Sequence, residues 1–164
     1  MTQADRRALA VEARGDLEIV MTREFNAPRH LIFEAWTKPE HLARWFGLRN
    51  EKTDAVVDLR IGGSYRYVLS DGAGGEMAIQ GEYLEIVAPE RLVCTERFEG
   101  EFFEMMGSGT INTMVLEERD GRTLMTLTAL YKTREARDAV IESPMAEGAA
   151  ITLDRLEELL QTLV

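Results

Sequence analysis

Apolar and polar positions follow two different periods along this chain. In residues 16–25 the apolar side chains recur at every second position, as in a strand with one buried face. In residues 26–47 they recur three and four positions apart, and Pro28 and Pro39 stand near the start of each half of this stretch. Gly47 follows the last apolar pair and ends the pattern. The pattern predicts one strand followed by two short helices.

Residues 51–131 contain strand-like segments separated by short turns. The sequence DGAGGE at residues 71–76 and the pair Asp120-Gly121 are typical of tight turns. Gly81 interrupts the long segment 77–87, which indicates a bulge or a bend there. Because consecutive strands are joined by short turns, we expect an antiparallel meander.

The helical period returns in residues 133–142 and in residues 145–164. The second segment is the longer, and its apolar positions form a continuous face that can cover a sheet. The predicted fold is therefore α+β: a curved antiparallel sheet wrapped around a long C-terminal helix, with a cavity between the layers. We assign residues 16–164 to a single domain and residues 1–15 to an N-terminal arm, which is either a short helix or disordered.

Composition restricts the partners of the protein. The chain has 29 acidic and 19 basic residues and a formal net charge of -10. A surface of this charge repels phosphate backbones and anionic lipids, so we expect no nucleic acid and no membrane as partners. The sequence has neither an apolar run of membrane-spanning length nor the apolar core of a secretory signal, which predicts a cytoplasmic protein.

Cysteine and histidine are too few for most metal or thiol chemistry. Cys94 is the only cysteine, which excludes a disulfide within the chain and a zinc site built on several thiolates. It is interpreted as a small buried hydrophobe, and a catalytic thiolate would need His30 or His41 as its base. His41 is expected either in solvent, in the first turn of a helix, or pointing into the pocket. Since no second histidine lies at metal spacing, we expect no metal and no other cofactor.

Aromatic residues supply candidate ligand contacts. Trp36 shares the inner helical stripe and is expected in the core, whereas Trp45 and Phe46 either plug one end of the sheet or line the mouth of a cavity. Four tyrosines fall on predicted strands: Tyr65, Tyr67, Tyr83 and Tyr131. Their side chains either serve packing alone or turn their hydroxyls into the cavity, where these would orient a ligand or act as acids.

The sequence FEGEFFEMMGSG at residues 98–109 is unusual for a connection between strands. Its large apolar side chains either extend a strand or form a gate over the pocket or a dimer contact; they are Phe102, Phe103, Met105 and Met106. Carboxylates also gather near the predicted sheet, and one that faced the cavity would have a raised pKa and could act as a base. The sequence does not select among Glu76, Glu82, Glu96, Glu99, Glu101 and Glu104.

Taken together, the motifs resemble one family. Five segments are similar, in the same order along the chain, to the Hsp90-ATPase-activator-homologue domain of the START-like, or helix-grip, superfamily. They are REFNAPRHLIFEAWTKPEHLARWFG, VDLRIGGSYRY, GEYLEIVAPERLVCTERF, GRTLMTLTALY and EGAAITLDRLEELL. The resemblance runs from about Asp16 to Leu160. It implies a helix-grip fold with an internal cavity, and binding of apolar or aromatic small molecules, as in many superfamily members.

The resemblance implies neither a set of catalytic residues nor activation of Hsp90. The eukaryotic co-chaperone has an additional N-terminal domain, for which we expect no room in 164 residues. Many relatives also have a bulky aromatic after the glycine of the last helix, in a GW pair that is Gly148-Ala149 here. If this side chain faces the cavity, the pocket of this chain is larger or differently shaped.

Three functional hypotheses follow. The first is a binding protein for a small hydrophobic molecule, with cavity walls that include Trp45, Phe46, Tyr65, Tyr67, Tyr83, Met114, Tyr131, Met145 and Ala149. The second is an enzyme, of cyclase, dehydratase or hydrolase type, that acts on a hydrophobic substrate in the same cavity. The third is a chaperone-associated interaction module, the least favoured, and a homodimer is compatible with all three.

Overall fold

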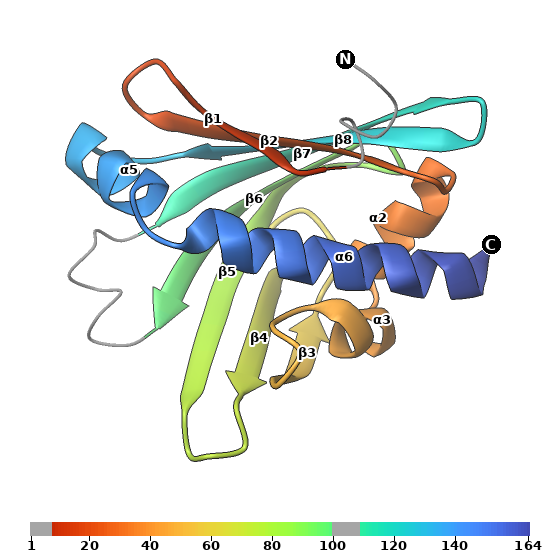
Figure 1. The fold of residues 1–164 in the computed structure, drawn as a ribbon, viewed down its shortest axis with the longest axis horizontal. Coiled ribbons are helices and arrows are strands. Elements are labelled where there is room, and N and C mark those ends of the chain that lie inside the picture. The colour runs from red at the N-terminus through yellow and green to blue at the C-terminus, as the bar shows by residue number, and fades with distance from the viewer. Residues whose placement is uncertain (1–7, 100–108) are drawn as a thin grey trace.

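The computed structural model of the protein describes residues 8–99 and 109–164 and shows an eight-stranded antiparallel sheet that bends around a long helix (Figure 1). The strands run in the order β1-β2-β8-β7-β6-β5-β4-β3. Their bounds are β1 (Ala10–Arg14), β2 (Glu18–Phe25), β3 (Lys52–Val57), β4 (Ser64–Ser70), β5 (Glu76–Val87), β6 (Arg91–Glu99), β7 (Thr110–Arg119) and β8 (Arg122–Leu130). The α+β fold and the meander from β3 to β8 predicted from the sequence are confirmed.

The helices lie on the inner side of the bent sheet or at its ends. They are α2 (Arg29–Thr37), α3 (Pro39–Trp45), α5 (Arg134–Ile141) and α6 (Met145–Leu163). As predicted, α2 and α3 connect the sheet strands β2 and β3, Pro39 occupies the first turn of α3, and Gly47 follows with a positive φ of 98°. None of the helices in the described residues is both long and apolar enough to cross a membrane.

Alternation along the strands decides which side chains face α6. In β4 the odd positions Tyr65, Tyr67 and Leu69 are buried, while Ser64 and Arg66 are exposed. The hairpin between β7 and β8 turns at Asp120 and Gly121, both with positive φ, as its sequence predicts. The buried residues form a single core between the inner face of the sheet and the helices.

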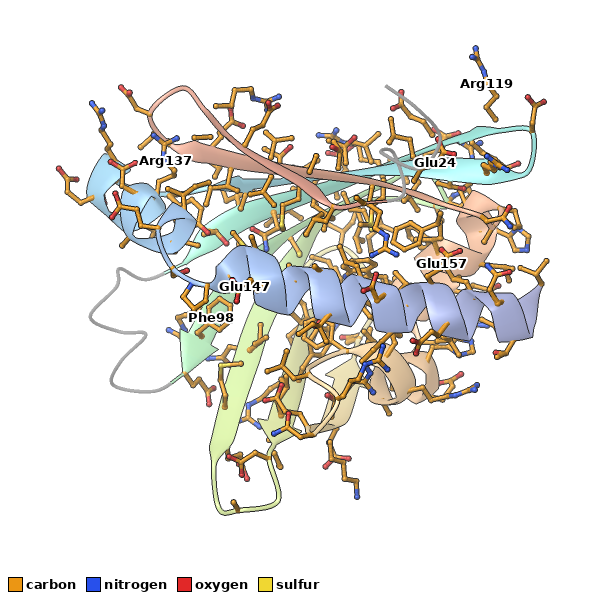
Figure 2. The ribbon with its side chains drawn as sticks, in the orientation of Figure 1. Glu24, Phe98, Arg119, Arg137, Glu147 and Glu157 are labelled. Carbon is orange, nitrogen blue, oxygen red and sulfur yellow. The ribbon has the colours of Figure 1, made fainter. Side chains whose placement is uncertain are left out.

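The N-terminal segment differs from the expected arm, because residues 10–14 form the edge strand β1. Most of its side chains are exposed, so it has no buried face that the sequence pattern could reveal. Pairing with β2 holds it instead, together with Arg137 of α5, which donates hydrogen bonds to the carbonyl oxygens of Gly15 and Glu18 at 2.9 and 3.0 Å (Figure 2).

Candidate functional site

A continuous row of aromatic rings crosses the inner face of the sheet from the short helices. Neighbouring ring centroids lie 4.7 to 5.4 Å apart in the order Trp36, Trp45, Phe46, Tyr67, Tyr65 and Tyr83. These are edge-on or tilted contacts, the arrangements that aromatic pairs prefer. The row therefore brings five of the nine predicted cavity residues into mutual contact.

The two tryptophans differ in burial: Trp36, expected in the core, is only partly buried, whereas Trp45 is buried as a plug at one end of the sheet would be. Trp45 is completely buried, and its indole Nε1 donates a hydrogen bond of 2.9 Å to the carbonyl oxygen of Ala35. Trp36 is only partly buried and packs against the outside of this cluster. Trp45 thus closes the core at the end of α3, and its contact with a ligand stays a prediction.

The tyrosine hydroxyls occupy two kinds of environment. Tyr65 Oη donates a hydrogen bond of 2.6 Å to the carbonyl oxygen of Thr95, and Cys94 Sγ lies 3.7 Å from the same hydroxyl. Tyr83 is 1% exposed, and its hydroxyl oxygen has no hydrogen-bond partner of normal geometry among the described residues. The hydroxyl of Tyr67 lies near enough to act on the pKa of Tyr83 but does not satisfy that oxygen.

Gly81 makes this tyrosine arrangement possible. A Cβ atom at this position would collide with the carbonyl oxygen of Thr95 and with the ring of Tyr65. Because Gly81 has no side chain, the ring of Tyr65 can lie across β5 and its hydroxyl can reach β6. The bulge expected near Gly81 is present slightly later, where the register between β5 and β6 shifts between Tyr83 and Glu85.

Glu96 is the acid that the strand register turns inward. It follows Leu92 and Cys94 at alternate positions of β6, and it pairs with Thr110 of β7. Burial raises the pKa of Glu96, while a hydrogen bond from the Asn112 side chain opposes this effect. The Thr110 hydroxyl donates to Asn112 Oδ1 at 2.7 Å, which leaves the amide group of Asn112 free to donate to the carboxylate.

The other candidate acids are placed differently. Glu76 and Glu82 are exposed, and Glu99 forms an ion pair of 2.9 Å with Arg66 on the outer face. Glu101 and Glu104 lie outside the described residues, as do the predicted gate residues Phe102, Phe103, Met105 and Met106. The register of β6 therefore selects Glu96, which the sequence pattern alone did not.

Cys94 and Tyr131 complete a polar cluster around Glu96. Burial raises the pKa of Cys94 to about 11, and burial together with the nearby Glu96 raises the pKa of Tyr131 to about 12. Burial also raises the pKa of Tyr65, Tyr67 and Tyr83. At neutral pH the thiol and all these phenols are protonated, so the cluster offers neutral hydrogen-bond donors beside one carboxyl group.

The inner face of α6 changes in character along the helix. Its buried residues are Leu153, Leu156, Leu159 and Leu160, which lie from the middle of the helix to its C-terminal end. Ala149 and Met145 continue the same face at intervals of four residues, and both are only partly buried. Met114, on the inner face of β7, is buried. The N-terminal half of α6 therefore covers the sheet less tightly than the C-terminal half does.

A pocket of about 440 Å³ lies at the other face of the sheet. It is lined largely by residues of β4, β5 and β6, among them Gln80, Glu82, Glu96 and Arg97, together with Lys132 just after β8. This lining is polar and differs from the aromatic cavity predicted between sheet and helix. The predicted cavity and its nine lining residues stay a prediction.

The bent antiparallel sheet, the two short helices after β2 and the long C-terminal helix define a helix-grip protein. A family model described as "Activator of Hsp90 ATPase homolog 1-like protein" matches residues 26–161, and the chain belongs to this family. The resemblance noted from the sequence motifs is thereby confirmed.

Solved structures support the same conclusion. A protein from Rhodobacter sphaeroides is similar with 25% identity and a TM-score of 0.87, covering 94% of this chain and 99% of that chain. A protein from Mycobacterium smegmatis shares 26% identity with a TM-score of 0.82, covering 93% of this chain and 96% of that chain. The search of curated proteins found no match.

Proposed function

We propose that this protein binds a small hydrophobic or aromatic molecule between the inner face of the sheet and the N-terminal half of α6. The observation that carries the proposal is the buried Tyr83 hydroxyl, which has no hydrogen-bond partner of normal geometry among the described residues, although the Tyr67 hydroxyl lies close to it. A buried polar group without a partner costs free energy, so such groups occur where a ligand or water completes the hydrogen bond.

The surroundings of this hydroxyl suit an aromatic ligand. The rings of Tyr65, Tyr67 and Phe46 provide apolar surface with defined orientation, and the partly buried Met145 and Ala149 lie on the covering helix. Membership of a helix-grip family, whose superfamily includes many binders of apolar molecules, supports the same function. Burial of ligand surface would drive binding, and the hydroxyls would orient the ligand.

The first experiment uses N-phenyl-1-naphthylamine, an uncharged probe whose fluorescence rises in apolar surroundings. We expect saturable binding to the purified protein and loss of this binding in Ala149→Trp, because the indole would fill the space under α6. Ile151→Trp is the matched control, since Ile151 is 40% exposed on the same helix and its replacement leaves the inner face unchanged.

Circular dichroism and urea unfolding establish that each variant is folded, and Ala149→Leu provides a smaller change if the tryptophan disrupts the helix. A probe that fails to bind the native protein, or that binds Ala149→Trp and Ile151→Trp equally well, contradicts the proposal. Native mass spectrometry of freshly purified protein adds an independent test, because a retained small molecule would increase the mass over that of the denatured chain.

A further inference from the structure

The pocket on the outer face of the sheet gathers polar side chains that have no partner within the described protein. Its volume of about 440 Å³ lies in the range of about 300 to 1,000 Å³ that is usual for small-molecule sites. The side chains of Gln80, Glu82, Arg97 and Lys132 line it, and none of them forms a hydrogen bond or an ion pair with another described residue. Their polar groups are therefore available to a ligand.

Strand register places these side chains on the same face of the sheet. Gln80 of β5 pairs with Arg97 of β6, and directly opposed residues of antiparallel strands point to the same side. Glu82 and Thr95 lie two positions away along their strands and share this face. Glu96 stands between Thr95 and Arg97, so alternation turns its carboxyl group to the inner face. Among the residues that line the pocket, Glu82 is thus the acid whose side chain faces outward.

A glycine separates the two cations of the pocket. Continuing the register of β7 with β6 and β8 by one row on this face places Gly109 between Arg97 and Lys132, and all three line the pocket. A Cβ atom at Gly109 would lie 3.9 Å from Lys132 Nζ, so the ammonium group stands beside the missing side chain. Arg97 and Lys132 therefore flank a gap in which an anion would meet two positive charges.

This local charge is opposite in sign to that of the whole chain. The formal net charge is -10, which repels anions from the surface in general. The acid Glu99 does not neutralise the pocket, because Arg66 forms an ion pair with it at 2.9 Å and lowers its pKa, while Arg97 adds a smaller effect from outside this pair. The pocket thus keeps two unpaired cations against one outward carboxylate.

We propose that this outer pocket binds a phosphate monoester of a small hydroxylated molecule, with the phosphate held between Arg97 and Lys132. A guanidinium group donates paired hydrogen bonds to phosphate oxygens, and an ammonium group binds them as a compact charge. The two cations also match the roughly two negative charges of a phosphate monoester near pH 7. The site lies on the opposite face of the sheet from the hydrophobic site proposed above and does not depend on it.

The remaining groups of the pocket suit the hydroxyl groups of such a ligand. The Thr95 hydroxyl accepts a hydrogen bond of 2.9 Å from the backbone N–H of Glu82, which leaves its own proton free to donate. The Gln80 amide can both donate and accept, and the Glu82 carboxylate accepts from a ligand hydroxyl. A ligand without hydroxyl groups would use the two cations alone.

Three probes separate the phosphate from the hydroxyl groups: glycerol 3-phosphate, inorganic phosphate and glycerol. Titration of the ¹⁵N-labelled protein, followed by NMR, measures affinity and locates the site. We expect glycerol 3-phosphate to shift the amide signals of Thr95 and Gly109 saturably and to bind several-fold more tightly than phosphate, whereas glycerol should not saturate. Absence of saturable shifts with glycerol 3-phosphate would overturn the inference. Equal affinity for phosphate would reject the hydroxylated ligand, because charge alone would then explain binding.

Arg97→Gln and Lys132→Gln should each weaken glycerol 3-phosphate binding about tenfold, because each removes charge-assisted hydrogen bonds. Arg119→Gln is the matched control and should leave the affinity unchanged. Arg119 is an exposed cation at the β7–β8 hairpin, and Figure 2 shows it at the opposite end of the sheet from Phe98, the neighbour of Arg97. The dispersion of the same NMR spectra establishes that each variant is folded.

An equal loss of affinity in all three variants would overturn the inference, since general charge rather than this pocket would then attract the phosphate. The variant Ala149→Trp, which tests the hydrophobic site, should bind glycerol 3-phosphate as the native protein does. The two proposals therefore fail separately: loss of N-phenyl-1-naphthylamine binding rejects the inner site, and loss of glycerol 3-phosphate binding rejects the outer one.

Discussion

At the scale of single residues, removing the hydroxyl of Tyr65 in β4 and removing that of Tyr83 in β5 should have different effects on the free energy of unfolding. Tyr65→Phe deletes a 2.6 Å hydrogen bond to a backbone carbonyl, and we expect a loss of about 1 kcal/mol in the free energy of unfolding. Tyr83→Phe deletes a buried hydroxyl without a partner among the described residues, so the ligand-free protein should be unchanged or more stable. Urea unfolding of both variants measures the difference, and equal losses would show that the Tyr83 hydroxyl is satisfied in solution.

Glu96 should make stability depend on pH in a direction opposite to that of a salt-bridged carboxylate. Its folded-state pKa is raised above the reference value of 4.5, so between these two values the folded chain binds more protons than the unfolded chain. This contribution to stability is complete below pH 4.5 and is lost as the pH rises through the folded-state pKa. Glu96→Gln should therefore stabilise the protein at pH 7 and change little at pH 4, as measured by urea unfolding at both pH values. Glu82→Gln controls for net charge, and a gain that is equal at the two pH values would contradict burial of the carboxyl group.

The sequence could predict which types of residue form this site, but not which of the candidate residues face the inner side of the sheet. Alternation in SYRYVLS is sufficient to place Tyr65 and Tyr67 on one face of a strand. The inward position of Glu96 depends on the pairing of β6 with β7 and on a register shift in β5, which involve residues far apart in the sequence. The missing hydrogen bond at Tyr83 depends on interatomic geometry, which no pattern of residues contains.

At the scale of elements, Arg155 joins α6 to the end of α3. Its guanidinium donates to the carbonyl oxygens of Gly47, Leu48 and Arg44 at 2.8 to 3.0 Å, and these carbonyls lie at or just beyond the C-terminus of the short helix α3. Arg155→Ala should lower the free energy of unfolding by about 2 kcal/mol, because it removes several charge-assisted hydrogen bonds from one contact. Urea unfolding provides the measurement.

Arg49→Ala is the matched control for this contact. Arg49 also connects the segment after α3 to α6, through an ion pair of 2.7 Å with Glu158, but both side chains are more than half exposed. Solvent screens such pairs, so the change should stay within about 0.5 kcal/mol. If both variants lost the same stability, exposed charge rather than carbonyl capping would hold the helix in place.

Helices and strands were predicted correctly where the hydrophobic period agreed with the residues that begin or end an element. The helices α2 and α3 have apolar residues at helical spacing, a proline near each start and a glycine after the end, and each signal has a local physical cause. Strand β1 lacked such signals, because an edge strand with exposed side chains is held by backbone pairing and by Arg137. Non-local contacts of this kind leave no period in the sequence.

At the scale of the whole molecule, the fold could be predicted because every level of the sequence agreed with one architecture. Strand alternation, turn residues and the long amphipathic C-terminal segment all required a sheet covered by a helix. The shape of the space under α6 could not be predicted in the same way. It depends on how far the partly buried Met145 and Ala149 stand from the opposing rings, which is a property of packing rather than of pattern.

Cys94 provides a probe of how the whole molecule opens. It is the only cysteine, it contacts the Tyr65 hydroxyl on the inner face, and its pKa of about 11 reduces the thiolate fraction at pH 8 roughly a hundredfold relative to an exposed thiol. Iodoacetamide should therefore label the native protein very slowly and the urea-unfolded protein rapidly, as followed by intact mass. A ligand bound against the inner face should slow native labelling further, because it stabilises the closed form in proportion to its saturation. Labelling that was fast in native conditions and insensitive to N-phenyl-1-naphthylamine would show that Cys94 is reached from solvent without opening of the helix over the sheet.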